Sequence, residues 1–66
     1  MKLSVDREAD ALYLRLDETP IVESEEVSPG VVLHCNRRKE VVGVEMLNLS
    51  KRPTAPDLSS IQFETA

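Results

Sequence analysis

The stretch ALYLRL, from Ala11 to Leu16, decides the fold of this chain. Its leucines alternate with Tyr13 and Arg15, which is the pattern of a β-strand with one buried face. A register shift of a single residue would move every leucine to the other face, so the pairing of this strand is strongly specified. The stretch therefore predicts a sheet with leucines on its inner face and Tyr13 on the opposite face.

The same alternation recurs in other short segments of the chain. They are Leu3–Val5, Val31–Cys35 and Val42–Met46. Valine is frequent in the last two, which favours strand over helix. Asp6–Asp10 joins the first two strands and Asn36–Glu40 joins the last two, and connections this short make the strands that they join antiparallel.

A longer acidic piece separates the two pairs of strands. Alternation between Ile21 and Val27 permits a fifth strand there, and its charges are typical of a sheet edge. The charges come from Glu23, Glu25 and Glu26. The sequence Ser28-Pro29-Gly30 that follows fits a type II turn.

The character of the chain changes after Leu47. Pro53 and Pro56 exclude a continuous helix or strand, so residues 51–66 are predicted to form a C-terminal arm. Within the arm, Ile61 and Phe63 suggest a short terminal strand, and a helical turn with Asp57 as its N-cap is the alternative.

We thus expect an all-β fold, with a single domain in residues 1–50 that is a small antiparallel meander of about four or five strands. The chain has 66 residues, of which 41% are hydrophobic. A chain this short buries only about 60% of the surface that its unfolded form exposes, so we expect a homodimer or a bound partner to complete the core.

The composition limits the classes of function. With 12 acidic against 8 basic residues, a net charge of -4, one Tyr, one Phe and no Trp, the chain is poorly suited to nucleic acid. One cysteine and one histidine allow neither an internal disulfide nor a zinc site within one chain. No apolar run approaches the roughly 18 residues of a membrane span, and no signal-peptide core is present, so a cytoplasmic location is expected.

Candidate catalytic groups give weak patterns. The spacing of Asp6, Glu8 and Asp10 is similar to the start of a calcium-binding loop, but Ala11 stands where that loop needs glycine, so we interpret the acids as turn residues. His34 and Cys35 are neighbours on a strand and therefore point to opposite faces. No catalytic, cofactor-binding or metal-ligating residue is predicted, and Cys35 is expected to be a small buried group.

Tyr13 is the most informative single residue. The missing side chain of Gly43 on another strand leaves room for such a ring, a known cross-strand pairing. If Val32, Val41 and Leu47 share the face of Tyr13, the sheet is apolar on both sides and binds a partner. The alternative is that one face closes the sheet into a small barrel.

The segment DREADALYLRL, Asp6–Leu16, resembles the opening motif D-x-E-A-D-A-L-Y-I-x-L of a family of small bacterial proteins known as a domain of unknown function. Glu25–Val32 and Val42–Leu47 are similar to later blocks of that family, so the resemblance covers roughly the first 50 residues. The family has no established catalytic residues. Its genes often lie beside RelE-like toxins, which implies an antitoxin-like role. Asn36–Glu40 departs from the acidic, glycine-containing turn of the family.

The leading hypothesis is a non-enzymatic module that binds a small basic protein, as an antitoxin-like partner of a toxin-type protein. Its candidate interaction residues are Tyr13, Glu23, Glu25, Glu26 and Phe63. One alternative is a small metal-dependent hydrolase that assembles Asp6, Glu8, Asp10 and His34 across a dimer. The other is a purely structural homo-oligomer.

Overall fold

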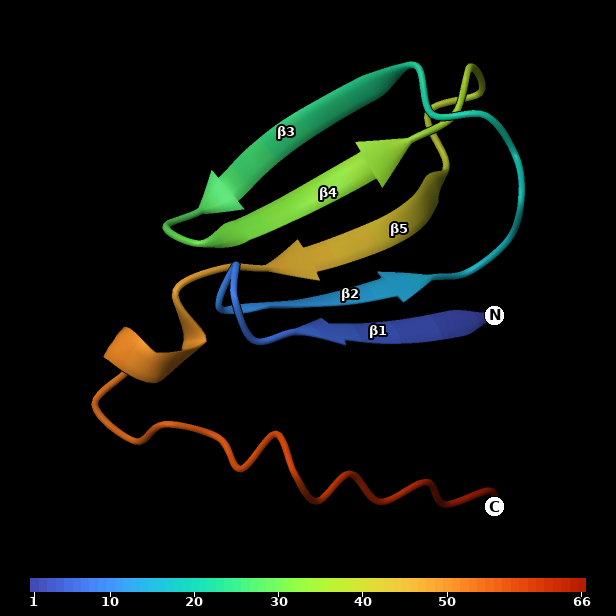
Figure 1. The fold of residues 1–66 in the computed structure, drawn as a ribbon. Helices are drawn as coiled ribbons and strands as arrows, with labels where there is room; N and C mark the ends of the chain where they lie inside the picture. Colours follow the sequence, from blue (N-terminus) through green and yellow to red (C-terminus); the bar gives the residue numbers. More distant parts are fainter.

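The strand expected around Tyr13 lies within a five-stranded antiparallel sheet (Figure 1). The computed structural model describes residues 1–66. Along the chain the elements are β1 (Lys2–Asp6), β2 (Ala11–Arg15), β3 (Glu23–Ser28), β4 (Val31–Cys35), β5 (Val41–Met46) and the 3-10 helix η1 (Leu49–Lys51). The predicted all-β antiparallel class is confirmed, including the acidic edge strand.

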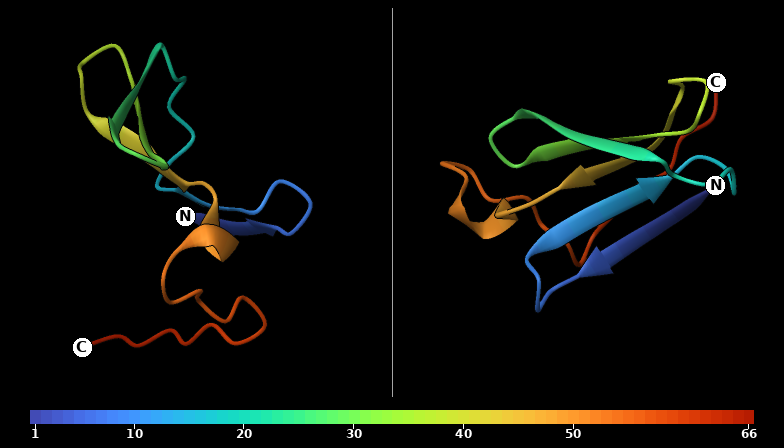
Figure 2. Two further views of the ribbon diagram at one scale, coloured as in Figure 1. Left: turned by 90° about the vertical axis from the view of Figure 1, so that its left-hand side faces the viewer. Right: turned by 90° about the horizontal axis from the view of Figure 1, so that it is seen from above.

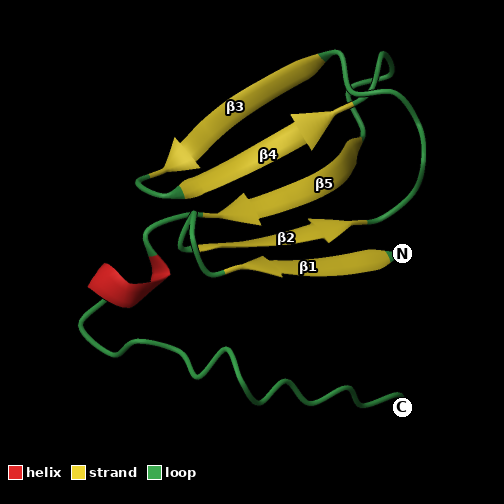
Figure 3. Cartoon of the chain, in the orientation of Figure 1, coloured by secondary structure: helices red, strands yellow, loops and turns green.

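The order of the strands differs from a meander, and that prediction was wrong. The order is β1-β2-β5-β4-β3, so β5, the last strand of the chain, lies between β2 and β4 (Figure 3). The physical reason is burial, because β5 contains Val42, which is 1% exposed, whereas every residue of β3 is exposed. The linker after Leu16 carries the chain past β5, so the acidic strand takes the edge.

The sheet is open, so the barrel that we considered does not form. β1 and β3 are its two ends, and the views in Figure 2 show a twisted sheet. Closure would require β1 to pair with β3, whose glutamates are solvated at the edge. Charges at an edge strand oppose pairing with another strand.

The strand register assigns the side chains to two faces. One, here called the apolar face, is formed by Leu3, Val5, Leu12, Leu14, Val31, Leu33, Val44 and Met46. The other, the polar face, is formed by Lys2, Ser4, Tyr13, Arg15, Ser24, Val32, His34 and Glu45. Val32 joins Tyr13 as expected, but the charged neighbours make this face polar, so a sheet that is apolar on both sides is not what forms.

Few residues are fully buried. They number 5 of 66 and include Ala11, Val42 and Leu49, the last at 3% exposed. Leu49 belongs to η1, which folds back on the end of the β1–β2 hairpin through its N–H bond to the Asp10 carbonyl (3.2 Å). Cys35 is a free thiol and is half-buried, less than expected. The buried apolar residues therefore lie at opposite ends of the sheet, with Ala11 and Leu49 at the end near η1 and Val42 at the other end.

Gly30 forms the tight turn between β3 and β4. It follows Pro29 and has a φ of 78°, as the third residue of a type II turn requires, which confirms the predicted turn. A Cβ at this position would also lie 3.0 Å from the Leu47 carbonyl oxygen. The Leu47 N–H donates to the Gly30 carbonyl at 2.7 Å, so the turn is joined to the end of β5.

Residues 52–66 form neither helix nor strand, and they run along the β1 side of the sheet (Figure 1). The terminal strand expected around Ile61 and Phe63 does not form, because no neighbouring strand pairs with it and Phe63 is 78% exposed. Asp57 starts a single turn, in which the Ser60 N–H donates to the Asp57 carbonyl (3.3 Å), and no helix follows. No helix in the structure has the length and apolarity that crossing a membrane requires.

Candidate functional site

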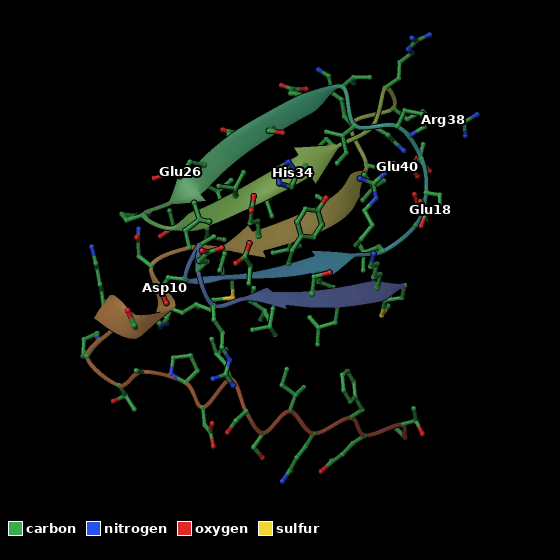
Figure 4. All side chains as sticks on the ribbon, viewed as in Figure 1. Asp10, Glu18, Glu26, His34, Arg38 and Glu40 are labelled. Atoms are coloured by element: carbon green, nitrogen blue, oxygen red, sulfur yellow. The ribbon has the colours of Figure 1, made fainter.

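A hydrogen-bonded cluster lies on the polar face around His34, and we call Tyr13, Ser24, His34 and Glu45 the His34 cluster. Ser24 lies opposite His34 across the β3–β4 pair, and its Oγ is 2.6 Å from Nδ1. On the other side of the ring, Nε2 is 3.1 Å from Glu45 Oε1. The Glu45 carboxylate accepts a hydrogen bond from the Nε2–H group, which leaves Nδ1 to accept a hydrogen bond from the Ser24 hydroxyl. Figure 4 labels His34 at the middle of the sheet.

Tyr13 completes the cluster from β2. Its ring stacks on the imidazole with centroids 5.4 Å apart and planes 8° apart. The same ring lies over Gly43, where an added Cβ would be 2.9 Å from the phenol oxygen. The predicted pairing of Tyr13 with Gly43 is thereby confirmed, and the lack of a side chain at Gly43 is a steric requirement of the cluster.

Arg15 connects the cluster to the chain that leaves β2. Its Nη1 donates to the Tyr13 hydroxyl at 3.4 Å, and its other guanidinium nitrogens donate to the carbonyls of Asp17 and Thr19. The linker is held a second time where the Val22 N–H donates to the Cys35 carbonyl at 2.9 Å. The Arg15 guanidinium therefore makes its hydrogen bonds to groups of the same chain.

The His34 cluster has the order hydroxyl, imidazole, carboxylate that is found in hydrolytic triads. It lies on an open sheet face, and of its four residues only Tyr13 lines a surface cavity, together with Lys2, Ser4, Arg15 and Glu18. In this structure the hydrogen bonds satisfy the imidazole and hold it against the Tyr13 ring. Sequence reasoning missed the roles of Ser24 and Glu45, because only the strand register brings them to His34.

The predicted acidic residues form a second surface, the β3 edge. Glu23 and Glu25 lie opposite Cys35 and Leu33, at the rim of the apolar face. Glu26, labelled in Figure 4, lies opposite Val32 on the polar face, just before a bulge in the strand. All these side chains are exposed. The structure therefore brings the glutamates together along one open edge.

The remaining candidate residues lie elsewhere. Tyr13 is half-buried on β2, and both β5 and β4 separate it from β3. Phe63 is exposed and belongs to the C-terminal segment, which runs on the side of the sheet away from β3 (Figure 1). The five candidate residues thus do not form one continuous surface.

The acids of the first turn have structural partners. Asp6 Oδ1 accepts the Ala9 N–H at 3.0 Å. Asp10 has a φ of 56°, and its carboxylate accepts the N–H and the hydroxyl of Ser50, with the hydroxyl at 2.7 Å. No group of three or more His, Cys, Asp and Glu side chains is placed to hold a metal ion. Asp10 therefore joins the first hairpin to η1.

Outside the sheet, two aspartates have a pKa below the ordinary value. Hydrogen bonding from the Thr19 side chain and backbone lowers the pKa of the Asp17 carboxyl. Ser59 lowers the pKa of Asp57 in the same way. Both carboxylates are exposed and cap their own turns, so the shifts reflect local turns.

The family model described as "Protein of unknown function (DUF2283)" matches residues 2–50. The chain belongs to the DUF2283 family. The match spans all strands of the sheet and reaches η1, so the DUF2283 region contains the His34 cluster, the β3 edge and the Asp10–Ser50 link. No curated protein and no solved structure matches the chain.

Proposed function

We propose that this chain is a non-enzymatic, cytoplasmic protein-binding module that binds a small basic protein along β3, in an antitoxin-like role. The observation that supports it is the edge itself. β3 is the end strand of the sheet, and all 6 of its residues are exposed. The outward backbone groups of an end strand are free to pair with a strand from another chain.

The charge of the β3 edge favours a basic partner. Glu23, Glu25 and Glu26 lie on this strand, and the whole chain has a net charge of -4. Glu23 and Glu25 share one face and are about 7 Å apart along the strand. A partner strand with Lys or Arg at alternate positions places its cations opposite this pair, so backbone pairing supplies affinity and charge supplies specificity.

A peptide-binding experiment tests this proposal. The probe is a short labelled peptide that alternates lysine and valine, compared with a peptide that has glutamate in place of lysine. We expect only the lysine peptide to bind, with an affinity that falls as salt is raised. The double variant Glu23→Gln/Glu25→Gln should weaken binding by at least about tenfold.

The matched control is the double variant Glu8→Gln/Glu64→Gln, which removes the same charge from exposed positions off β3. It should bind the lysine peptide nearly as well as the original chain. Equal losses in both double variants would mean that net charge alone attracts the peptide. Binding that does not respond to salt would contradict the electrostatic part of the proposal.

The His34 cluster supports a second candidate function, a serine hydrolase. In that reaction the Ser24 oxygen would attack an acyl carbon while its proton passes to His34 Nδ1. The protonated ring would return that proton to the alcohol or amine that leaves, and water would then hydrolyse the acyl–Ser24 bond and restore the hydroxyl. Incubation with a fluorophosphonate and mass spectrometry distinguish the two functions. The binding-module proposal expects no label on Ser24, and stoichiometric label on Ser24 that His34→Gln abolishes would establish the hydrolase.

The metal-dependent alternative has a separate test. Asp6 and Asp10 already accept hydrogen bonds within the chain, and they lie in the first turn, away from His34 on β4. We expect no change in melting temperature when magnesium, manganese, calcium or zinc is added to the chain. A stabilisation that rises with metal concentration and disappears in Asp6→Asn would instead support a metal site.

A further inference from the structure

The apolar face of the sheet is only partly covered. Val42, which alternates with Val44 and so shares this face, is buried at one end of it, whereas the other side chains of the face are only half-buried, although they come from β1, β2, β4 and β5. In residues 52–66, only Leu58 is half-buried, beside Leu12 and Met46 at one end of the face. The rest of the C-terminal segment is exposed, so it does not form a second layer over the sheet.

The solvent-exposed area of the whole chain is larger than expected for a folded monomer of its mass. The chain exposes 5343 Å². A folded monomer of 7.4 kDa is expected to expose about 4200 Å², so the excess is about 1100 Å². A stable interface takes about 800 Å² from each partner. An excess of this size is therefore enough for one interface.

We propose that the apolar face binds the apolar face of a second copy of this chain, forming a two-fold symmetric β-sandwich. The side chains of this face on β1, β2, β4 and β5 are uncharged, so two chains that each have a net charge of -4 meet without placing like charges in the centre. In a two-fold interface the same patch of each chain meets its own copy, and an uncharged patch does so without opposing like charges.

The sandwich explains the small core. Two sheets pack face to face about 10 Å apart, with their strands within about 30° of each other. Their side chains then become the core that a chain with 5 buried residues lacks. Glu23 and Glu25 lie at the rim, where they stay solvated, and the β3 edge remains open to a further strand. This interface is independent of the proposed peptide-binding edge.

Adjacent residues of β1 provide a matched test. Leu3 lies on the apolar face opposite Leu14, and Ser4 lies on the polar face opposite Tyr13. We expect light scattering to give about 15 kDa for the original chain and for Ser4→Glu, twice the 7.4 kDa of one chain. Leu3→Glu should raise the dimer dissociation constant by at least about tenfold, because a buried charge opposes association.

Isotope-edited NMR on the unaltered chain gives a second measurement, which does not depend on whether Leu3→Glu folds. In dimers mixed from labelled and unlabelled chains, intermolecular NOEs should connect the methyl groups of Leu14, Val44 and Leu33. A monomeric original chain, a dimer that Leu3→Glu leaves unchanged, or NOEs from Tyr13 and His34 instead would each overturn the proposal. Lysine-peptide binding by Leu3→Glu separates this result from the test of the β3 edge.

Discussion

Asp10 makes hydrogen bonds to a much more distant part of the chain than its sequence position suggests. As a turn residue it was expected to bond locally, but its carboxylate accepts bonds from Ser50, 40 positions away. Its φ of 56° is a conformation that aspartate tolerates better than most residues. The acid therefore has a conformational and a long-range role, and both are structural.

Replacing Asp10 with alanine should destabilise the fold. The change removes charge-assisted hydrogen bonds to Ser50 and puts a less tolerant residue at positive φ, so the free energy of unfolding should fall by about 1–3 kcal/mol. Urea denaturation measures it. Glu8→Ala is the control, since it is an exposed neighbour in the same turn, and its effect should stay within about 0.5 kcal/mol. Equal effects of the two changes would refute a special role for Asp10.

Gly43→Ala should disturb the Tyr13 ring. The added Cβ would stand 2.9 Å from the phenol oxygen, so the ring must move off His34, at a cost of about 1–3 kcal/mol. A double-mutant cycle with Tyr13→Ala checks the cause, because Gly43→Ala should cost much less once the ring is absent. Additive effects of the two changes would show that the ring and the glycine are not coupled.

The residue scale also separates what sequence can predict from what it cannot. The pairing of Tyr13 with Gly43 was predictable, because alternation assigns each a face and glycine leaves space. The bonds of His34 to Ser24 and Glu45 were not, because they depend on which strands are neighbours and on their exact register.

At the scale of elements, the hairpins were predictable and their order was not. Short connections fix β1 beside β2 and β4 beside β5, as observed. Alternation within a strand determines which side chains share a face, but both a meander and the observed order satisfy it. The burial of β5 in the centre and the solvation of β3 decide between them, and both are properties of the assembled sheet.

The β4–β5 turn carries a prediction at this scale. The Asn36 Oδ1 accepts the N–H groups of Arg38 and Glu40, at 2.9 and 3.0 Å, and Lys39 is left at a φ of 64°. Lys39→Gly should therefore raise the free energy of unfolding by about 0.5–1 kcal/mol, because glycine adopts this conformation without a Cβ clash. Thermal unfolding measures the change, and Arg38→Gly, whose φ is not positive, should not stabilise the chain.

At the scale of the whole molecule, the free energy of unfolding should fall at low pH. The folded-state pKa of Asp17 is below its ordinary value of 3.8, so its ionised form stabilises the fold above that pH, and this contribution is lost as pH falls through the lower folded value. Urea midpoints measured between roughly pH 2 and 6 should fall at the acid end. The dependence should be shallower in Asp17→Asn, and Glu18→Gln is the control that removes one neighbouring charge. Identical slopes in Asp17→Asn and the original chain would contradict it.

The family and the fold class could be predicted from the sequence, but the position of a binding site could not. The family and the all-β class could be identified from residues 2–50. The candidate site could not be located as one surface, because Tyr13, the glutamates of β3 and Phe63 lie on different parts of the fold. Alternation identifies faces and edges, whereas a binding site depends on which faces stay open after folding.

The central position of β5 has a consequence for the synthesis of the chain. The strand that lies in the middle of the sheet leaves the ribosome after the other four strands of the sheet. Until residues 41–46 emerge, the nascent chain holds β1–β2 and β3–β4 as hairpins with no strand to join them, and isolated hairpins are marginally stable. The sheet can therefore form completely only after residues 41–46 have emerged and joined β2 to β4.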